Sequence, residues 1–263
     1  MEVLTVSDLH LGKPGWGRYG EEVLDQLAQR ASETDVLVIG GDVVDPTDNR
    51  EENENRLREA LALIGKLPID HKLAVIGNND LDCFDGPVGE YVGRMAPWYQ
   101  ESGVSLLDKA PVLIRGILFA GSLGWCNGSL FRGDLPMDRI NDYWENSKRY
   151  RGRQGGLKPF TLHAICMTRL REQLRRVAAK HVVVVTHTVP TPNLVRYGDS
   201  EMDDYLNCFM GFDGSRYPDI YDPSRTRLSL VGHTHHPGQA TLNGLPIINM
   251  SGGDQPRLVN IPS

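Results

Sequence analysis

Near its start the chain reads Val3-Leu4-Thr5-Val6-Ser7-Asp8-Leu9-His10, a short apolar, β-branched run followed by polar side chains. Such a run predicts a buried strand that ends in a loop. The same order recurs at residues 35–39, which precede Asp42, and at residues 72–76, which precede Asn78. Three predicted strands therefore each deliver Asp or Asn into a loop.

Helical patterns separate these runs. Apolar residues recur with helical spacing in residues 22–31, and a charged helix is predicted over residues 50–64, so the opening of the chain reads as β-α-β units. Further helices are predicted up to Glu101 and over residues 161–180. The remaining predicted strands lie at residues 104–107, 112–114, 117–120, 182–185, 228–231, 239–242 and 247–249. The close spacing of the first three predicts antiparallel hairpins.

Composition predicts an ordinary compact protein. The 263 residues are 40% hydrophobic and 24% charged, with a net charge of −6. This length favours one large domain, and the mild acidity gives no global attraction to nucleic acid or to an anionic membrane. No apolar run approaches the length of a membrane span, and no basic leader precedes the first strand, so we expect a cytoplasmic protein. The four cysteines are widely spaced, which predicts reduced thiols.

Side chains able to bind metal follow five of the predicted strands. They are Asp8 and His10, Asp42 and Asp45, Asn78 and Asp80, His187, and His233 and His235. Each alone has a structural explanation, such as a turn cap or a core histidine. Loops at the carboxyl ends of parallel strands converge, however, so we expect these side chains to meet. Imidazole and carboxylate ligands together suit zinc, manganese or iron better than calcium.

In their order and spacing, the five blocks resemble the calcineurin-like metallophosphoesterases. The blocks are Asp8-Leu9-His10, Gly41-Asp42-Val43-Val44-Asp45, Gly77-Asn78-Asn79-Asp80, Thr186-His187 and Gly232-His233-Thr234-His235. The resemblance implies an α/β fold, a four-layer α/β/β/α sandwich of two facing mixed sheets flanked by helices. We expect one domain over residues 1–263, with irregular insertions at about 121–160 and 188–225 near the active site.

The resemblance also implies a centre for two divalent or trivalent metal ions, Mn, Fe or Zn. One ion would take Asp8, His10, Asp42 and His235; the other would take Asn78, His187, His233 and the bridging Asp42. The implied activity is phosphoester hydrolysis by a metal-bridging hydroxide. Asp42, Asp45, Asn79 and Asp80 are the catalytic candidates, and Asp45 would orient a ligand.

Departures from the family pattern narrow the substrate class. Pro46 stands where serine/threonine protein phosphatases and symmetrical dinucleoside tetraphosphate hydrolases carry arginine, and Asp45 stands where purple acid phosphatases have a tyrosine ligand. Asn79 replaces the histidine that many relatives are proposed to use as a proton donor, and an amide cannot supply a proton. His163 and His236 are the candidates for that role.

We therefore expect a small-molecule phosphodiesterase or phosphatase acting on a small anionic phosphoester. A nuclease, a nucleotide or lipid pyrophosphatase, and a non-catalytic binding scaffold are the alternatives. No membrane partner is expected, nucleic acid is a minor possibility, and the oligomeric state is left open.

A basic segment lies inside the first predicted insertion. Residues 148–153 carry four positive charges, and a solvated surface loop is one interpretation. The other interpretation is a substrate-binding loop, because the planar guanidinium group of arginine binds phosphate in a bidentate manner. In that interpretation the substrate-binding residues are Arg132, Arg149 and Arg151, with Trp125 stacking on an aromatic leaving group.

Overall fold

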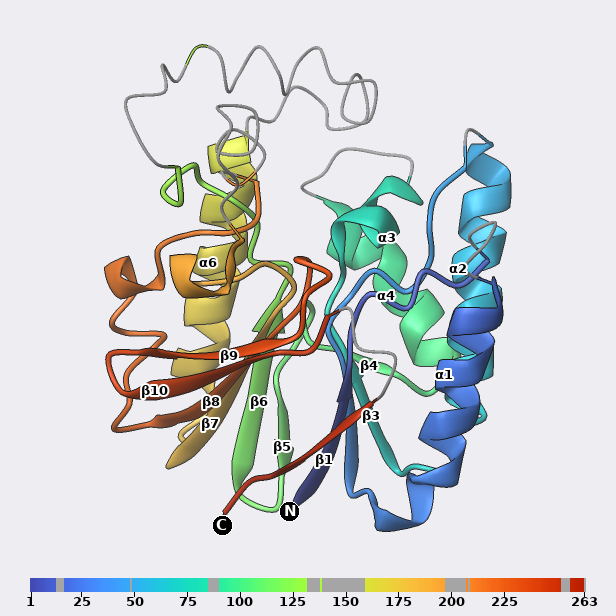
Figure 1. The fold of residues 1–263 in the computed structure, drawn as a ribbon, viewed down its shortest axis with the longest axis horizontal. Coiled ribbons are helices and arrows are strands. Elements are labelled where there is room, and N and C mark those ends of the chain that lie inside the picture. The colour runs from blue at the N-terminus through green and yellow to red at the C-terminus, as the bar shows by residue number, and fades with distance from the viewer. Residues whose placement is uncertain are drawn as a thin grey trace.

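The structure is a computed structural model. It describes residues 1–12, 17–47, 49–84, 90–131, 138, 159–196, 207, 209–251 and 256–262. Two β-sheets face each other, and helices cover their outer faces (Figure 1). The predicted α/β sandwich is confirmed.

The first sheet contains the strands that open the chain. Its order is β11-β1-β2-β3-β4, with β1 at Glu2–Val6, β2 at Val36–Ile39, β3 at His71–Ala74, β4 at Ser105–Leu106 and β11 at Arg257–Asn260. The strands β1 to β4 are parallel, so their carboxyl ends lie along one edge. The strand β11 runs antiparallel to β1.

The second sheet has the order β5-β6-β7-β8-β10-β9. Its strands are β5 at Val112–Ile114, β6 at Ile117–Ser122, β7 at His181–Thr186, β8 at Thr226–Val231, β9 at Gly238–Leu242 and β10 at Leu245–Asn249. Parallel pairing joins β6, β7, β8 and β10, and the outer strands β5 and β9 are antiparallel to their neighbours. Buried aliphatic side chains such as Val38, Val75, Val183 and Leu230 fill the core between the sheets.

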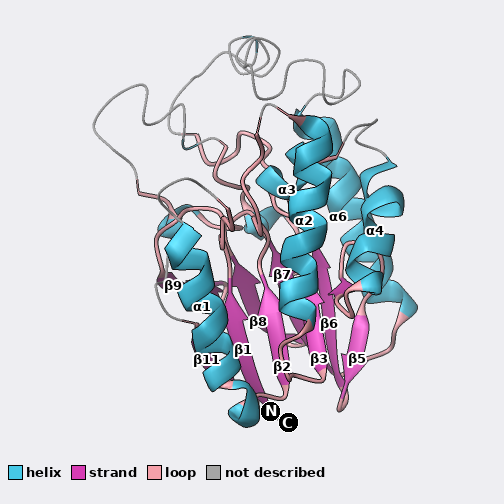
Figure 2. Ribbon diagram, turned by 90° about the vertical axis from the view of Figure 1, so that its right-hand side faces the viewer, coloured by secondary structure: helices cyan, strands magenta, loops and turns pink. Residues whose placement is uncertain are grey.

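Helices complete the layers. The helices α1 at Gly17–Gln29, α2 at Arg50–Gly65 and α4 at Tyr91–Glu101 lie over the first sheet (Figure 2), while α6 at Pro159–Arg176 packs on the second. Connections through these helices make the strands parallel, as a crossover requires. None of the helices in the described part of the chain is long and apolar enough to span a membrane.

Two local predictions need correction. The hairpin is confirmed for β5 and β6, but residues 104–107 do not join it, because β4 pairs in parallel with β3. The chain reaches β4 through α4, and this crossover places β4 in the first sheet. The predicted loop at residues 77–80 begins the short helix α3 at Asn78–Asp82, and the Asp80 carboxylate caps it by accepting from Gly77 N at 2.9 Å.

Most of the first predicted insertion, and a smaller part of the second, falls outside the described residues. Residues 132–137 and 139–158 of the first are not described, nor are residues 197–206 and 208 of the second. The described part of the second contains two short 3₁₀ helices, at Pro192–Leu194 and Gly214–Arg216.

The loops after β2 and β3 touch backbone to backbone. A Cβ atom added at Gly77 would lie 2.1 Å from the Asp42 nitrogen, and one added at Gly41 would lie 2.6 Å from the Gly77 nitrogen. Only glycine fits at such a contact, and Gly41 also has a left-handed φ of +91°. The two glycines therefore let the Asp42 and Asn78 loops approach each other.

We expect Gly77→Ala to lower the free energy of unfolding by about 1–3 kcal/mol, because the new methyl group collides with backbone. Urea unfolding would measure this. Gly93→Ala is the control: Gly93 is an exposed position of α4 with nothing within 4 Å of the added atom. Alanine should stabilise that helix by about 0.5–1 kcal/mol. Equal effects at the two positions would contradict the steric argument.

Candidate metal centre

The structure brings together all the side chains predicted to bind metal. They lie at the shared carboxyl-terminal edge of the two sheets and form two groups. The first ligand group is Asp8, His10, Asp42 and His235, and the second is Asp42, His187 and His233 together with Asn78. Asp42 belongs to both groups. Within each set of His and Asp side chains, the candidate ligand atoms lie within 4.8 Å of one another.

The first ligand group gathers around two imidazole nitrogens. His10 Nε2 lies 3.1 Å from His235 Nε2, and Asp8 Oδ1 lies 3.3 Å from His235 Nε2 and 4.0 Å from His10 Nε2. His10 Nδ1 donates to Asp45 Oδ1 at 2.8 Å. This hydrogen bond fixes the proton on Nδ1, so the Nε2 lone pair points into the group.

The second ligand group is arranged in the same way. His187 Nε2 lies 3.0 Å from Asn78 Oδ1, 3.5 Å from Asp42 Oδ1 and 3.1 Å from His233 Nδ1. The outer nitrogens bond to main-chain carbonyls: His187 Nδ1 donates to Gly40 O at 2.7 Å, and His233 Nε2 donates to Phe209 O at 3.2 Å. The backbone therefore orients both rings.

These arrangements fit a cation in each group. Ligand atoms around an ion bound at about 2.1 Å stand roughly 3–4 Å apart, as the atoms here do. Among the described residues the buried Asp8 Oδ1 has only the His235 ring nitrogen nearby, at 3.3 Å and without good hydrogen-bond geometry, while its second oxygen accepts from Ser7 Oγ at 2.6 Å. A buried carboxylate oxygen without a donor is costly unless a cation neutralises it.

The electrostatics of the centre also favour positive charge. Burial alone would lower the pKa of His187, but the negative charge of Asp42 raises it to about 9. Burial would raise the pKa of Asp42, and the positive charge of His187 instead holds it below its ordinary range. Burial together with the charge on His187 lowers the pKa of His233 to about 4. The negative charge of Asp42, which stabilises a proton on His187, would equally stabilise a metal ion beside it.

Asn79 and Asp80 contact the shared carboxylate and the backbone of the loops. Asn79 donates through its amide to Asp42 Oδ2 at 2.9 Å and to Asp45 Oδ1 at 3.2 Å, and its main-chain nitrogen donates to Asp42 Oδ1 at 2.8 Å. The Asp80 carboxylate accepts from main-chain N–H groups, including Val43 N at 2.8 Å. Asn79 therefore orients the shared carboxylate, and Asp80 joins two loops.

The ligand loops have unusual backbone conformations. Positive φ angles occur at Asp8 (59°), His10 (46°), Asp42 (52°), His233 (75°) and His235 (55°). Non-glycine residues with positive φ cost energy and gather at functional sites. Main-chain bonds such as Asp8 N to Gly41 O, at 3.0 Å, hold these turns in place.

The centre opens towards solvent on one side. Asp8, His10 and Asp42 are at most 2% exposed, whereas the His235 side chain is 41% exposed. A ligand would therefore reach the centre past His235.

Of the other predicted residues, the structure describes three: Trp125, His163 and His236, the last of which is exposed beside His235. Trp125 is 3% exposed and packs in the core, so its stacking role stays a prediction that this conformation does not display. His163 Nδ1 lies 2.9 Å from the carbonyls of Gly124 and Trp125, and its Nε2 lies 2.6 Å from the Tyr217 hydroxyl. Both ring nitrogens are engaged, and burial lowers the pKa of His163, so it is poorly suited to donate a proton.

Arg132, Arg149 and Arg151 lie outside the described residues, so their substrate-binding role stays a prediction. Sequence reasoning missed Ser7 and the carbonyls of Gly40 and Phe209. Only the position of Ser7 beside Asp8 offered a signal, because a carbonyl contact leaves no trace in residue type.

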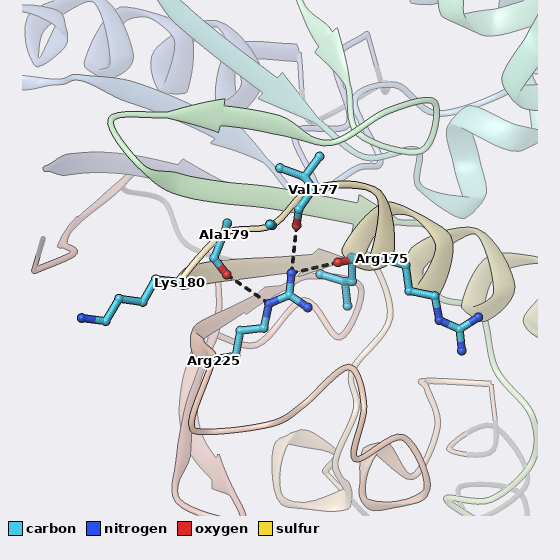
Figure 3. A pocket seen from close by; sticks show the side chains of 7 residues that line it. Arg175, Val177, Ala179, Lys180 and Arg225 are labelled. Carbon is cyan, nitrogen blue, oxygen red and sulfur yellow. Dashed lines mark hydrogen bonds between the residues drawn. The ribbon is translucent and has the colours of Figure 1, made fainter.

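A separate pocket lies at the other end of the second sheet, before β7 and β8 begin. It has a volume of about 470 Å³ and is lined by the end of α6, by residues 177–180, which follow that helix, and by Arg225 (Figure 3). Arg225 donates to the carbonyls of Leu174, Val177 and Ala179 at 2.8, 3.1 and 3.2 Å. The guanidinium therefore caps the helix, far along the strands from the candidate metal centre.

Comparison with known proteins agrees with this geometry. A family model described as calcineurin-like phosphoesterase matches residues 1–237. The phosphopantetheinyl hydrolase from Mycobacterium tuberculosis is similar in fold, with a TM-score of 0.68 and 16% identity over 95% of this chain and 88% of that one. A dimetal phosphatase from Danio rerio has a TM-score of 0.59 and 15% identity over 95% and 86% of the two chains. No curated protein sequence matches.

We expect Asp45→Asn to weaken metal binding in the first ligand group by about 10–100-fold, because His10 loses the carboxylate that fixes its orientation. Titration with Mn²⁺ would measure the change. Asp222→Asn is the control, since the side chain of this half-buried aspartate accepts from Ser224 in a turn just before β8, at the end of the strand opposite the centre. Unaltered affinity in Asp45→Asn would show that the contact between Asp45 and His10 does not orient a ligand.

Proposed function

The chain belongs to the calcineurin-like phosphoesterase family, and on that premise we propose that it is a two-metal hydrolase of small phosphoesters, a phosphodiesterase or phosphatase. One observation carries the proposal. Two groups of convergent lone pairs share the Asp42 carboxylate, so two cations bound there would be adjacent. Manganese, iron and zinc all suit this mixture of imidazole nitrogen and carboxylate oxygen.

The charges support an anionic substrate. Two divalent cations bring four positive charges against two negative charges from Asp8 and Asp42, so the loaded centre is positive. The protein as a whole has a net charge of −6, so this attraction is local. A phosphate group would be drawn to the side on which His235 is exposed.

Bound metal ions would supply Lewis acidity and an activated water. The residues of the chain hold the metal ligands in position. Asn79 holds both oxygens of Asp42, and Asp45 holds the ring of His10. Because Asn79, Asp42 and His10 are at most 4% exposed, water competes little for the ligands, and the centre is organised before substrate arrives.

We expect Asp42→Asn to abolish hydrolysis and to reduce bound metal from about two ions per chain, because the neutral amide is a poor bridge. The assay would use phosphomonoesters, phosphodiesters and a phosphopantetheinyl substrate with added Mn²⁺, and metal content would be measured directly. Asp219→Asn, which alters a surface pair with Arg171, is the control. Near-wild-type turnover in Asp42→Asn would refute the two-metal proposal.

We also expect rates to depend steeply on the pKa of the leaving group. General acid help is typically worth about 10²–10⁴-fold, and neither the Asn79 amide nor the engaged ring of His163 can supply it. Aryl esters should therefore react much faster than alkyl esters. His236→Ala should leave the dependence unchanged. Equal rates for aryl and alkyl esters would show that another group protonates the leaving oxygen.

A further inference from the structure

The second ligand group takes its members from both sheets. Asn78 follows β3 of the first sheet and His187 follows β7 of the second, yet Asn78 Oδ1 and His187 Nε2 lie only 3.0 Å apart. A small relative movement of the two sheet edges would separate these atoms. Some interaction must therefore fix the distance between the edges at this point.

Asp108 occupies that position. It follows β4, is 2% exposed, and lies between the two sheets at their carboxyl-terminal edge. Its Oδ2 accepts from Ile76 N at 2.9 Å, and its Oδ1 accepts from Leu123 N at 2.8 Å. Ile76 continues from β3 and Leu123 continues from β6, so one carboxylate binds the ends of strands from different sheets.

Both contacts lead to members of the second ligand group. Ile76 is two residues before Asn78. On the other side, Leu123 O accepts from Thr188 N at 3.3 Å, and Thr188 is the neighbour of His187. A short path of covalent and hydrogen bonds therefore runs from Asn78 through Asp108 to His187.

The surroundings hold Asp108 firmly. The Tyr91 hydroxyl donates to Asp108 Oδ1 at 3.4 Å. Gln173 Nε2 donates to the carbonyls of Leu107, beside Asp108, and Gly121, at 2.7 and 3.0 Å. Burial raises the pKa of Asp108 to about 6, so the group is mainly ionised at neutral pH and both main-chain bonds are charge-assisted.

We propose that Asp108 is a positioning residue of the second metal site, which sets the spacing of Asn78 and His187 by joining the ends of β3 and β6. This inference rests on the proposed two-metal function. It predicts a selective effect: changing Asp108 weakens the second site while Asp8, His10 and His235 continue to hold the first ion.

The chain offers a matched control. Asp35 also joins the two sheets, but at the opposite edge, where its Oδ2 accepts from Glu2 N at 2.8 Å and its Oδ1 pairs with Arg115 Nη1 at 2.6 Å. Asp35→Asn therefore removes an inter-sheet contact without touching the metal centre. It separates a local positioning effect from a general loosening of the sandwich.

The experiment is a Mn²⁺ titration of wild type, Asp108→Asn and Asp35→Asn by calorimetry, with bound metal counted and thermal unfolding recorded. Wild type and Asp35→Asn should bind two ions. Asp108→Asn should bind one of the two ions at least tenfold less tightly than wild type does and keep the affinity of the other. Asp108→Glu keeps the charge but moves both oxygens, so it should also weaken the binding of one ion and not of the other. It replaces Asp108→Asn in the experiment if that variant does not fold.

Two results would overturn the inference. One is unchanged binding of both ions by the Asp108 variants. The other is equal weakening of both sites in step with lost stability, which a merely structural residue would produce. Failure of the proposed function looks different: wild type itself would then bind fewer than two ions and hydrolyse no phosphoester.

Discussion

The structure depends on one constraint, that imidazole and carboxylate groups from two separate sheets must face one another within hydrogen-bonding distance. His10 of the first sheet and His235 of the second meet at 3.1 Å, and Asp42 of the first lies 3.5 Å from His187 of the second. Lone pairs at such separations repel unless a proton or a cation lies between them, and the buried carboxylates provide the field that holds it. The sandwich brings these groups together because parallel strands from both sheets end at one edge, where the glycine contacts let the loops approach.

This arrangement costs backbone energy. The left-handed conformations at Asp8, His10 and Asp42, together with those at His233 and His235, would each be unfavourable in an isolated loop. Hydrogen bonds that continue the pairing of β1 and β2 beyond their ends, such as His10 N to Asp42 O at 3.1 Å, hold the turns in place. Ordinary sheet pairing thus stabilises the conformations that aim the ligands, and the burial of apolar side chains between the sheets stabilises the pairing.

Much of this could be predicted from the sequence. Buried strands such as residues 182–185 are visible as apolar runs, and the polar residues that follow them were predicted to meet, as they do, because parallel strand ends converge. The fold class was predicted from the family resemblance that the same residues carry. Pairing between distant segments could not be predicted. The strand β4 pairs with β3 in the first sheet and not in a hairpin, and no strand was predicted at the position of β11, which pairs with β1. The direction of the side chains could not be predicted either, and the structure shows that the Asn79 amide donates to Asp42. Asp108 lies outside every motif, so its contacts with Ile76 and Leu123 had no signal in the residue pattern.

The position of β1 has a consequence for how the chain folds during synthesis. Asp8 and His10 follow this strand, which pairs with β2 on one side and with β11, more than 250 residues along the chain, on the other. Closing so long a loop is entropically costly and occurs late. Until Arg257–Asn260 emerges from the ribosome, one edge of β1 stays unpaired, and exposed strand edges invite association between nascent chains.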